Sequence, residues 1–201
     1  RIIIQNNINA KKLIVIYDRN IPKKIINRFK NKLTGNKSIF LRLNFNEKVK
    51  NLNTVKKILD VLSKNNFNRN DCVISIGGGI AGDICSFASS VYKRGLKFVN
   101  IPSTLLSQVD SSIGGKTGVN NFLGKNMIGT FYQPNVVIND TIFLKSLPKR
   151  EMICGYAEIL KHSLISNKNF FIFLKNNFKG ILNLKPQIIK KAIFNSCKIK
   201  K

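Results

Sequence analysis

A glycine-rich segment in the middle of the chain combines the residue types that bind an anionic substrate. Residues 108–126 have the sequence QVDSSIGGKTGVNNFLGKN and contain Asp110, Lys116, Lys125 and Asn126. The paired glycines allow a tight backbone turn, so these side chains can face one concavity, where lysine is suited to phosphate or carboxylate. A single lysine in so basic a chain is more simply explained as a solvated surface charge. The combination with Asp110 and the glycines favours a substrate-binding loop.

A second glycine run directly follows a hydrophobic stretch. Residues 75–87, SIGGGIAGDICSF, place Gly79, Gly82 and Asp83 where a strand is expected to pass into a helix. Glycine lets backbone N–H groups approach a pyrophosphate, and a helix N-terminus adds positive potential. A plain strand-to-helix turn is the alternative, and the spacing differs from GxGxxG. The context favours phosphate or dinucleotide binding.

Glu158 and His162 are the third candidate pair. They are four residues apart on an expected helix, so they share a face and could both ligate a metal. His162 is the only histidine in the chain. A lone histidine is more often structural, and the sequence offers no third ligand at a suitable spacing. We therefore expect a metal site on this helix to be completed by residues outside these 201.

Alternating strands and helices are expected to position these residues. Strands are predicted at 12–18, 37–43, 72–79, 96–102 and 134–140, and helices at 21–33 and 52–65. This alternation indicates an open, mostly parallel α/β sheet of the Rossmann-like kind, which binds ligands at the carboxyl ends of its strands. The connection 103–134 is too long for an ordinary loop in a compact domain, which favours a functional role.

The pattern changes after residue 148. Helical periodicity continues through 151–165, 170–178 and 186–201 without an intervening strand. We therefore predict an α/β domain over 1–148 and the start of an all-helical domain over 149–201. The chain begins with Arg1 and ends inside a helical pattern without a glycine or proline stop, so both ends are expected to be cropped.

Composition narrows the class of protein. Lys plus Arg is 35 and Asp plus Glu is 9, a net charge of +26 that would suit nucleic acid or an anionic substrate. The basic residues are scattered without an arginine-rich tract, so no specific nucleic-acid partner is expected.

No apolar run approaches the ~20 residues of a membrane span, and no signal peptide is visible. The cysteines are far apart and are expected to be reduced, mostly buried thiols of a cytoplasmic protein: Cys72, Cys85, Cys154 and Cys197.

Several segments together resemble the 3-dehydroquinate synthase family of sugar phosphate cyclases. These are GGGIAGD, YKRG, IPSTLLSQVDSSIGGKTGVN, GKNMIGTFYQP, LPKRE and GYAEILKH, in the family's order and spacing. The resemblance implies an NAD-binding α/β domain, a helical domain with a divalent metal (zinc or cobalt), and an active site between them. It also implies conversion of 3-deoxy-D-arabino-heptulosonate 7-phosphate to 3-dehydroquinate and phosphate in the shikimate pathway, by a homodimer.

The resemblance assigns roles by matched motif. Residues expected at NAD are Asp18, Asn20, Glu47, Lys50, Gly79, Gly82, Asp83, Ser103, Thr104, Lys116, Lys125, Phe143, Leu144, Lys145 and Ser146. Residues expected at the sugar phosphate are Arg94, Asp110, Lys116, Lys125, Asn126 and Lys161. In the family the arginine matching Arg94 comes from a neighbouring subunit. Glu158 matches the first metal ligand and His162 matches none, because the other two ligands are histidines further downstream. These 201 residues alone are therefore expected to be inactive.

Three other interpretations stay open. Another sugar phosphate cyclase would share the cofactors and most of the loop. An iron-dependent alcohol dehydrogenase of related fold is disfavoured by the complete DSSIGGK segment at 110–116. The third interpretation is a protein without enzymatic activity. It would be either a non-catalytic NAD-binding fragment or a basic nucleic-acid-binding remnant.

Overall fold

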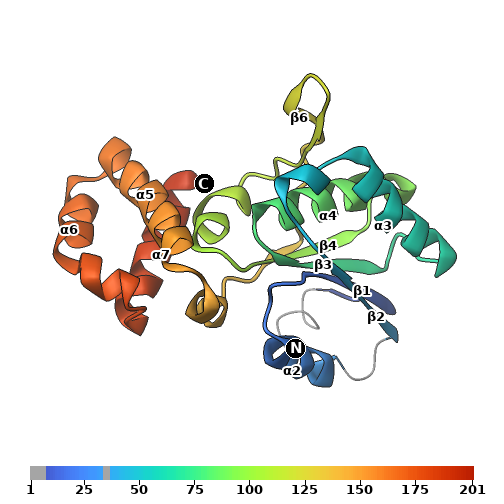
Figure 1. The fold of residues 1–201 in the computed structure, drawn as a ribbon, viewed down its shortest axis with the longest axis horizontal. Helices are drawn as coiled ribbons and strands as arrows, with labels where there is room; N and C mark the ends of the chain where they lie inside the picture. Colours follow the sequence, from blue (N-terminus) through green and yellow to red (C-terminus); the bar gives the residue numbers. More distant parts are fainter. Residues whose placement is uncertain (1–7, 34–36) are drawn as a thin grey trace.

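A parallel sheet forms the centre of the larger part of the molecule. The computed structural model describes residues 8–33 and 37–201. Its five-stranded sheet has the order β2-β1-β3-β4-β7, with every neighbouring pair parallel (Figure 1). The strands are β1 (Lys12–Asp18), β2 (Lys37–Leu43), β3 (Cys72–Gly77), β4 (Lys97–Pro102) and β7 (Val136–Val137). The predicted α/β fold with a mostly parallel sheet is confirmed.

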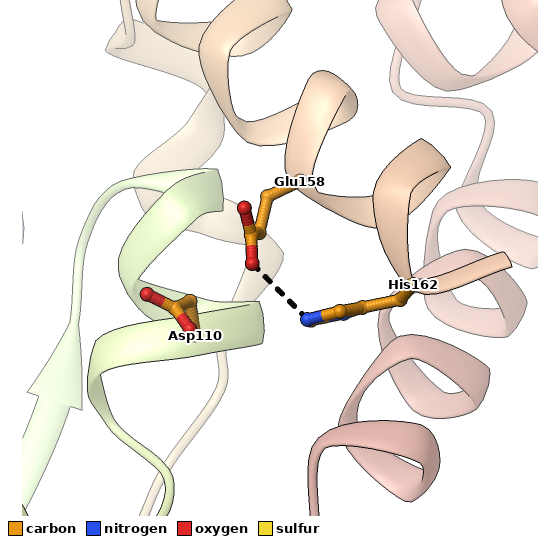
Figure 2. Close-up of side chains that lie close together, drawn as sticks. All are labelled: Asp110, Glu158 and His162. Carbon is orange, nitrogen blue, oxygen red and sulfur yellow. Dashed lines mark ion pairs between the residues drawn. The ribbon is translucent and has the colours of Figure 1, made fainter. Parts of the chain in front are cut away.

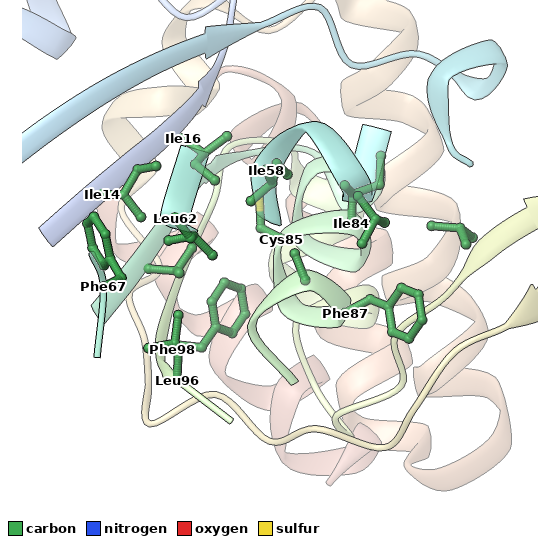
Figure 3. Packing of buried hydrophobic residues seen from close by; sticks show 14 residues of the cluster. Ile14, Ile16, Ile58, Leu62, Phe67, Ile84, Cys85, Phe87, Leu96 and Phe98 are labelled. Atoms are coloured by element: carbon green, nitrogen blue, oxygen red, sulfur yellow. The ribbon is translucent and has the colours of Figure 1, made fainter. Parts of the chain in front are cut away.

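Helices cover both faces of this sheet. They are α2 (Lys23–Lys32), α3 (Leu52–Lys64) and α4 (Gly79–Val91), with the first on one face and the other two on the opposite face (Figure 1). Successive side chains of a strand point to opposite faces, so alternate residues of β1 belong to different cores. Ile14 and Ile16 lie in the cluster with α3 and α4 (Figure 3), whereas Leu13 and Val15 lie in the cluster with α2. The sheet is thus buried on both sides, as parallel sheets require.

The long connection between β4 and β7 contains regular structure that the sequence did not predict. A π-helical turn, η3 (Ser107–Ser111), comes first. An antiparallel hairpin of β5 (Val119–Asn121) and β6 (Gly124–Ile128) follows and projects from the body of the molecule (Figure 1). The return to the sheet is also shorter than the predicted strand 134–140, because only two residues of β7 pair with β4.

Three long helices follow the sheet. They are α5 (Lys149–Ser166), α6 (Lys168–Leu182) and α7 (Pro186–Lys200), and the short helical turns of the chain are η1 (Glu47–Val49), η2 (Tyr92–Arg94) and η4 (Thr141–Ser146). Leu105, Val109 and Leu144 pack into the same hydrophobic cluster as α5–α7. Since this cluster contains residues from both sides of position 148, the division into domains 1–148 and 149–201 stays a prediction.

Gly155 brings α5 against the segment that precedes η3. A Cβ atom built on Gly155 would lie 2.5 Å from the Cβ of Leu105, so only glycine permits this approach. Glu158 is three residues further along the same helix and therefore on the same side. The contact places Glu158 beside the turn that carries Asp110.

The four cysteines have different surroundings. All are free thiols, and burial raises the pKa of Cys72 and of Cys85 to about 12. Cys154 is exposed and Cys197 is half-buried. The prediction of mostly buried thiols is therefore wrong for Cys154.

In the described ranges, no helix combines the length and the apolar character needed to cross a bilayer.

Candidate active site

The start of α4 is an uncapped helix N-terminus packed against η3. Gly78 is the N-cap, no side chain caps the helix, and no acid occupies its first turn. A Cβ on Gly79 would lie 2.9 Å from Ser111 Oγ, and one on Gly78 would lie 3.3 Å from Thr104 Cγ2. The helix begins four residues before Asp83, which lies in its second turn. The glycines therefore leave a narrow space at a positive helix end, which suits an anion.

A buried lysine connects this helix to the hairpin. Lys50 Nζ lies 2.6 Å from Asp83 Oδ2 and 2.5 Å from Asn126 Oδ1. Burial raises the pKa of the Asp83 carboxyl, and the hydrogen bond from Lys50 works against this rise. Lys50 is itself buried. These three predicted site residues thus form one hydrogen-bonded group, in which Asp83 neutralises Lys50.

Lys125 points away from that group. Its Nζ lies 3.7 Å from Glu47 Oε1, and its side chain is 73% exposed. Glu47 also accepts a hydrogen bond of 2.8 Å from Asn120 Nδ2, which is the main reason why the pKa of Glu47 is lowered. The expectation that Lys125 faces the same concavity as Lys116 and Asn126 is therefore wrong for this structure.

A cavity of about 460 Å³ lies between η3, the hairpin and the end of α7. Asp110, Lys116 and Asn126 line it, as the sequence predicted for a substrate loop, and Lys200 from α7 joins them. Lys200 Nζ lies 2.8 Å from Asp110 Oδ1. The cavity thus combines an acid, two lysines and an amide, a donor and acceptor set that fits a hydroxylated anion.

Glu158, His162 and Asp110 meet at the edge of this cavity. Their ligand atoms all lie within 4.8 Å of one another, and Figure 2 shows Glu158 and His162 on α5 facing Asp110 on η3. Glu158 Oε1 lies 3.1 Å from His162 Nε2 and also contacts Lys161 Nζ. Neither contact is aligned as a hydrogen bond, so this shielded oxygen is held by charge alone. Asp110 is thus a spatial neighbour of Glu158 and His162 that the sequence spacing did not reveal, and the completion of a metal site by residues outside these 201 stays a prediction.

His162 is buried and held from its far side. Its Nδ1 lies 2.7 Å from Ser196 Oγ on α7, and Ser196 is fully buried. Burial lowers the pKa of His162, while the negative charge of Glu158 raises it less strongly. The imidazole is therefore neutral near pH 7, the state in which a histidine nitrogen can bind a metal.

The remaining predicted cofactor residues lie near the carboxyl ends of β1 and β4. Asp18 accepts hydrogen bonds from the backbone N–H groups of Asn20 at 2.7 Å and Phe45 at 3.2 Å, so its carboxylate shapes the turn after β1. Ser103 donates its backbone N–H to Gly77 O at 2.8 Å. The turns after β1, β3 and β4 therefore lie along one edge of the sheet, where ligands of such folds bind.

The predicted residues of η4 divide between core and surface. Phe143 and Leu144 are buried in the second and third hydrophobic clusters, whereas Lys145 and Ser146 are exposed. The cofactor contact of these four residues stays a prediction.

Arg94 lies away from the cavity described above. It lines a separate cavity of about 540 Å³ together with Arg69, Lys97 and Tyr132. Its φ of +65° follows a φ of +46° at Lys93, so the loop is held in a left-handed conformation that non-glycine residues rarely adopt. Tyr132 Oη donates a hydrogen bond of 2.5 Å to Leu96 O beside this loop. The structure does not bring Arg94 to the other predicted substrate residues of the same chain.

Sequence reasoning missed Lys200 and Ser196. Both belong to the last helix and lie far along the chain from their partners Asp110 and His162. Lysine is so abundant in this chain that one more carries no signal, and a serine inside a helical pattern carries none either. Only the packing of α7 against η3 and α5 reveals them.

Solved structures share this arrangement of sheet and helices. The 2-epi-5-epi-valiolone synthase of Streptomyces hygroscopicus, solved with NAD⁺ and Zn²⁺ bound, has a TM-score of 0.88 and 26% identity over 94% of this chain and 54% of that one. An iron-containing alcohol dehydrogenase from Thermotoga maritima has a TM-score of 0.73 at 16% identity over 98% of this chain and 62% of that one, and shares the fold alone. The fold is that of the sugar phosphate cyclase class.

Sequence comparisons identify one family within the sugar phosphate cyclases. The family described as 3-dehydroquinate synthase N-terminal matches residues 40–154, and 3-dehydroquinate synthase C-terminal matches residues 155–201. The 3-dehydroquinate synthase of Pelagibacter ubique is 59% identical over 98% of the chain, and that of Buchnera aphidicola is 45% identical over 94%. The chain belongs to the 3-dehydroquinate synthase family. It spans about half the length of these curated relatives, 54% and 52% respectively.

Proposed function

We propose that the chain forms the NAD-binding half and the first metal-binding helices of a 3-dehydroquinate synthase. The reaction converts 3-deoxy-D-arabino-heptulosonate 7-phosphate to 3-dehydroquinate and phosphate. The observation that carries the proposal is the cavity lined by Asp110, Lys116, Asn126 and Lys200, with Glu158 at its edge. Membership of the family supports the particular substrate, since the fold alone would also serve related cyclases.

The α4 N-terminus is the proposed position of the NAD pyrophosphate. Its first turn has no side-chain cap, and a Cβ at Gly79 would fill the space beside Ser111. Backbone N–H groups at such a helix end bind phosphate oxygens directly. In this proposal Lys50 offsets the negative charge of Asp83, so that the carboxylate does not repel the bound anion.

Glu158 is the proposed position of the divalent cation. Its Oε1 atom is shielded from solvent and lacks an aligned hydrogen bond, which fits a group that a cation would satisfy. When bound, NAD would supply a hydride acceptor for one secondary alcohol, and the cation would supply a Lewis acid at the oxidised oxygen.

The remaining polar groups of the cavity are proposed to hold the substrate. Lys116 and Lys200 bind its anionic groups, and Asn126 donates from its amide nitrogen, because its Oδ1 is occupied by Lys50. Asp110 accepts a hydrogen bond from a substrate hydroxyl. Arg94 is proposed to serve a second copy of the chain, since its own cavity is lined by different residues. The homodimer and the cytoplasmic location stay predictions, as does the lack of a specific nucleic-acid partner.

Another cyclase product is the alternative. The similarity to a 2-epi-5-epi-valiolone synthase, at 26% identity, favours this alternative less than the 59% identity to a 3-dehydroquinate synthase. Product analysis with the full-length enzyme separates them. We expect 3-dehydroquinate and phosphate in equal amounts from the heptulosonate phosphate. A different carbocycle would exclude the proposed reaction, and the 201 residues alone are expected to give no turnover.

NAD binding to the 201-residue chain tests the cofactor half. Titration calorimetry should show saturable binding of NAD, and Gly79→Val should abolish it, because the added side chain fills the space next to Ser111. Gly124→Ala is the matched control, since a Cβ there meets only the flexible Met127 side chain at 3.5 Å. Equal binding by wild type and Gly79→Val would place the nucleotide elsewhere.

A further inference from the structure

Asn120 lies where the pairing of the β5–β6 hairpin becomes irregular (Figure 1). Val119 pairs with Ile128 and Asn121 pairs with Gly124, so one residue of β5 faces three residues of β6 at this point. The backbone N–H of Asn120 donates instead to Lys50 O at 2.8 Å. Irregular pairing of this kind is common beside active sites, where it re-aims a side chain.

The side chain of Asn120 makes two further hydrogen bonds, one from each end of its amide. Its Oδ1 accepts the backbone N–H of Asn126 at 2.9 Å, and its Nδ2 donates to Glu47 Oε1 at 2.8 Å. An amide offers an acceptor and a donor at once, which these two partners require. Asn120 therefore joins the hairpin to the segment that carries Glu47 and Lys50.

These contacts close a ring of three residues. Lys50 Nζ donates to Asn126 Oδ1 at 2.5 Å, the Asn126 N–H donates to Asn120 Oδ1, and the Asn120 N–H donates to Lys50 O. Asn126 has a φ of +57°, a left-handed conformation that the bond from its N–H helps to hold. The direction of the Asn126 side chain, which lines the cavity, is thus fixed from outside the cavity.

We propose that Asn120 is a positioning residue, which holds the substrate-facing Asn126 and the cofactor-facing Glu47 in one fixed arrangement. The inference rests on the proposed function, because the contact of Asn126 with the sugar phosphate and that of Glu47 with NAD are themselves proposals. The motif resemblance assigns no role to Asn120. It acts only through the side chains that it binds.

The ring also connects the two ligand positions. Removing the Asn120 amide would release the Asn126 N–H and the Glu47 carboxylate together, although these residues are far apart in the sequence. Groups in one hydrogen-bond network support one another, so the loss is felt on both sides. The affinities for the sugar phosphate and for NAD should therefore fall together.

The test uses steady-state kinetics of the full-length enzyme with saturating NAD and divalent cation. Asn120→Ala should lower kcat/KM for the heptulosonate phosphate at least about tenfold, because a misplacement of about 1 Å can cost about 100-fold. In titration calorimetry its NAD affinity should fall about two- to tenfold, the worth of one net hydrogen bond. Wild-type values of either quantity would overturn the proposal. Circular dichroism confirms that each variant is folded.

Asn120→Asp separates the two ends of the amide. An aspartate oxygen can still accept the Asn126 N–H, so kcat/KM should return to within about threefold of wild type, less than the worth of one hydrogen bond. The second oxygen would face the Glu47 carboxylate and repel it, so the NAD affinity should stay low. Equal losses of kcat/KM in the alanine and aspartate variants would refute the acceptor role of Asn120.

Asn121→Ala is the matched control. Asn121 Oδ1 accepts only from the hairpin's own turn, from the Leu123 N–H at 2.9 Å and the Gly124 N–H at 3.1 Å. A general loosening of the hairpin would therefore appear in this variant too, whereas we expect its kcat/KM to change by less than about threefold. Equal losses in Asn121→Ala and Asn120→Ala would mean that Asn120 only stabilises the hairpin, which contradicts the proposal.

Carboxyl-carbon NMR of Glu47 gives a readout that does not depend on the reaction. The hydrogen bond from Asn120 is the largest cause of the lowered pKa of Glu47, so Asn120→Ala should raise this pKa toward its ordinary value of 4.5. Asn121→Ala should leave it unchanged, and an unchanged pKa in Asn120→Ala would overturn the inference. If wild type makes no 3-dehydroquinate, the proposed function fails, while this titration and the NAD affinity still decide the inference.

Discussion

At the scale of single residues, Lys50 connects three segments that are far apart in the sequence. It precedes α3, and its ammonium group reaches Asp83 in α4 and Asn126 in the hairpin. A buried lysine is stable only when its charge is paired, and Asp83 provides the pairing. The same contact works against the rise in the pKa of Asp83 that burial causes.

Lys50→Met is expected to lower the free energy of unfolding by about 1–3 kcal/mol, since Asp83 loses its partner while partly buried. The pKa of Asp83 then rises further. A carboxyl whose pKa is raised in the folded state favours folding at low pH and loses that contribution as the pH rises through the folded-state pKa. The stability of the variant should therefore fall over a wider pH range than that of wild type, as measured by urea unfolding.

The control for this prediction is Lys56→Met. Lys56 and Asp60 form an exposed pair on α3, so the change in stability should stay below about 1 kcal/mol. The double variant Lys50→Met/Asp83→Asn should recover part of the loss, because it no longer leaves a charge unpaired. A loss equal to that of the single variant would show that Asp83 is not the affected group.

His162 gives a prediction of opposite sign in the absence of cations. Its pKa is lowered from the ordinary value of 6.5, so the unfolded chain binds a proton that the folded chain excludes. The stability this provides is complete above the unfolded-state pKa and is lost as the pH falls below it. Urea unfolding at a series of pH values should show this loss, and His162→Gln should remove it. An unchanged pH profile in the variant would assign the effect to another group.

At the scale of elements, the contact between α5 and the segment before η3 sets the geometry of the cavity edge. Leu105 and Val109 anchor this segment in the helical core, while Asp110 faces the cavity. The regular structure around it arises from this packing, since the Ser- and Gly-rich sequence gives no helical periodicity. Helix α5 can approach only because residue 155 has no side chain.

Gly155→Ala tests which of two effects is larger. Alanine favours a helix over glycine by about 1 kcal/mol, but its Cβ would lie 2.5 Å from Leu105 Cβ and 2.7 Å from the Leu106 nitrogen. The clash should outweigh the propensity, with a net loss of about 1–3 kcal/mol in thermal or urea unfolding. Ala157→Val, at an exposed position two residues away, should cost less than about 1 kcal/mol. A stabilised Gly155→Ala would show that the helix can move aside.

At the scale of the whole molecule, the sequence predicted the sheet better than the site. Runs such as Cys72–Gly77 are buried on both faces and bounded by turn residues, so their strand character is local information. The helices after residue 148 were likewise evident from their periodicity. The hairpin and the π-helical turn were not, because their formation depends on contacts with α4, α5 and α7.

The site was predictable where it follows a local motif. Lys116, Asn126 and Asp110 line one cavity as expected, whereas Lys125 turns toward Glu47 instead. Which way a lysine points is decided by the nearest acid in space, and sequence spacing does not contain that information. The proximity of Asp110 to His162 could not be predicted from sequence spacing either, since it depends on how α5 packs against η3.

The dependence of the group formed by Asp110, Glu158 and His162 on this packing has a consequence for the order of folding. Asp110 reaches Glu158 and His162 only after α5 has docked on η3, and Ser196 joins only after α7 has docked as well. A partly folded chain, with the sheet formed and the helices loose, would lack the cluster altogether. Any ligand that binds this group would therefore favour the completely folded chain over every intermediate, by a free energy that grows with the logarithm of its concentration above the dissociation constant.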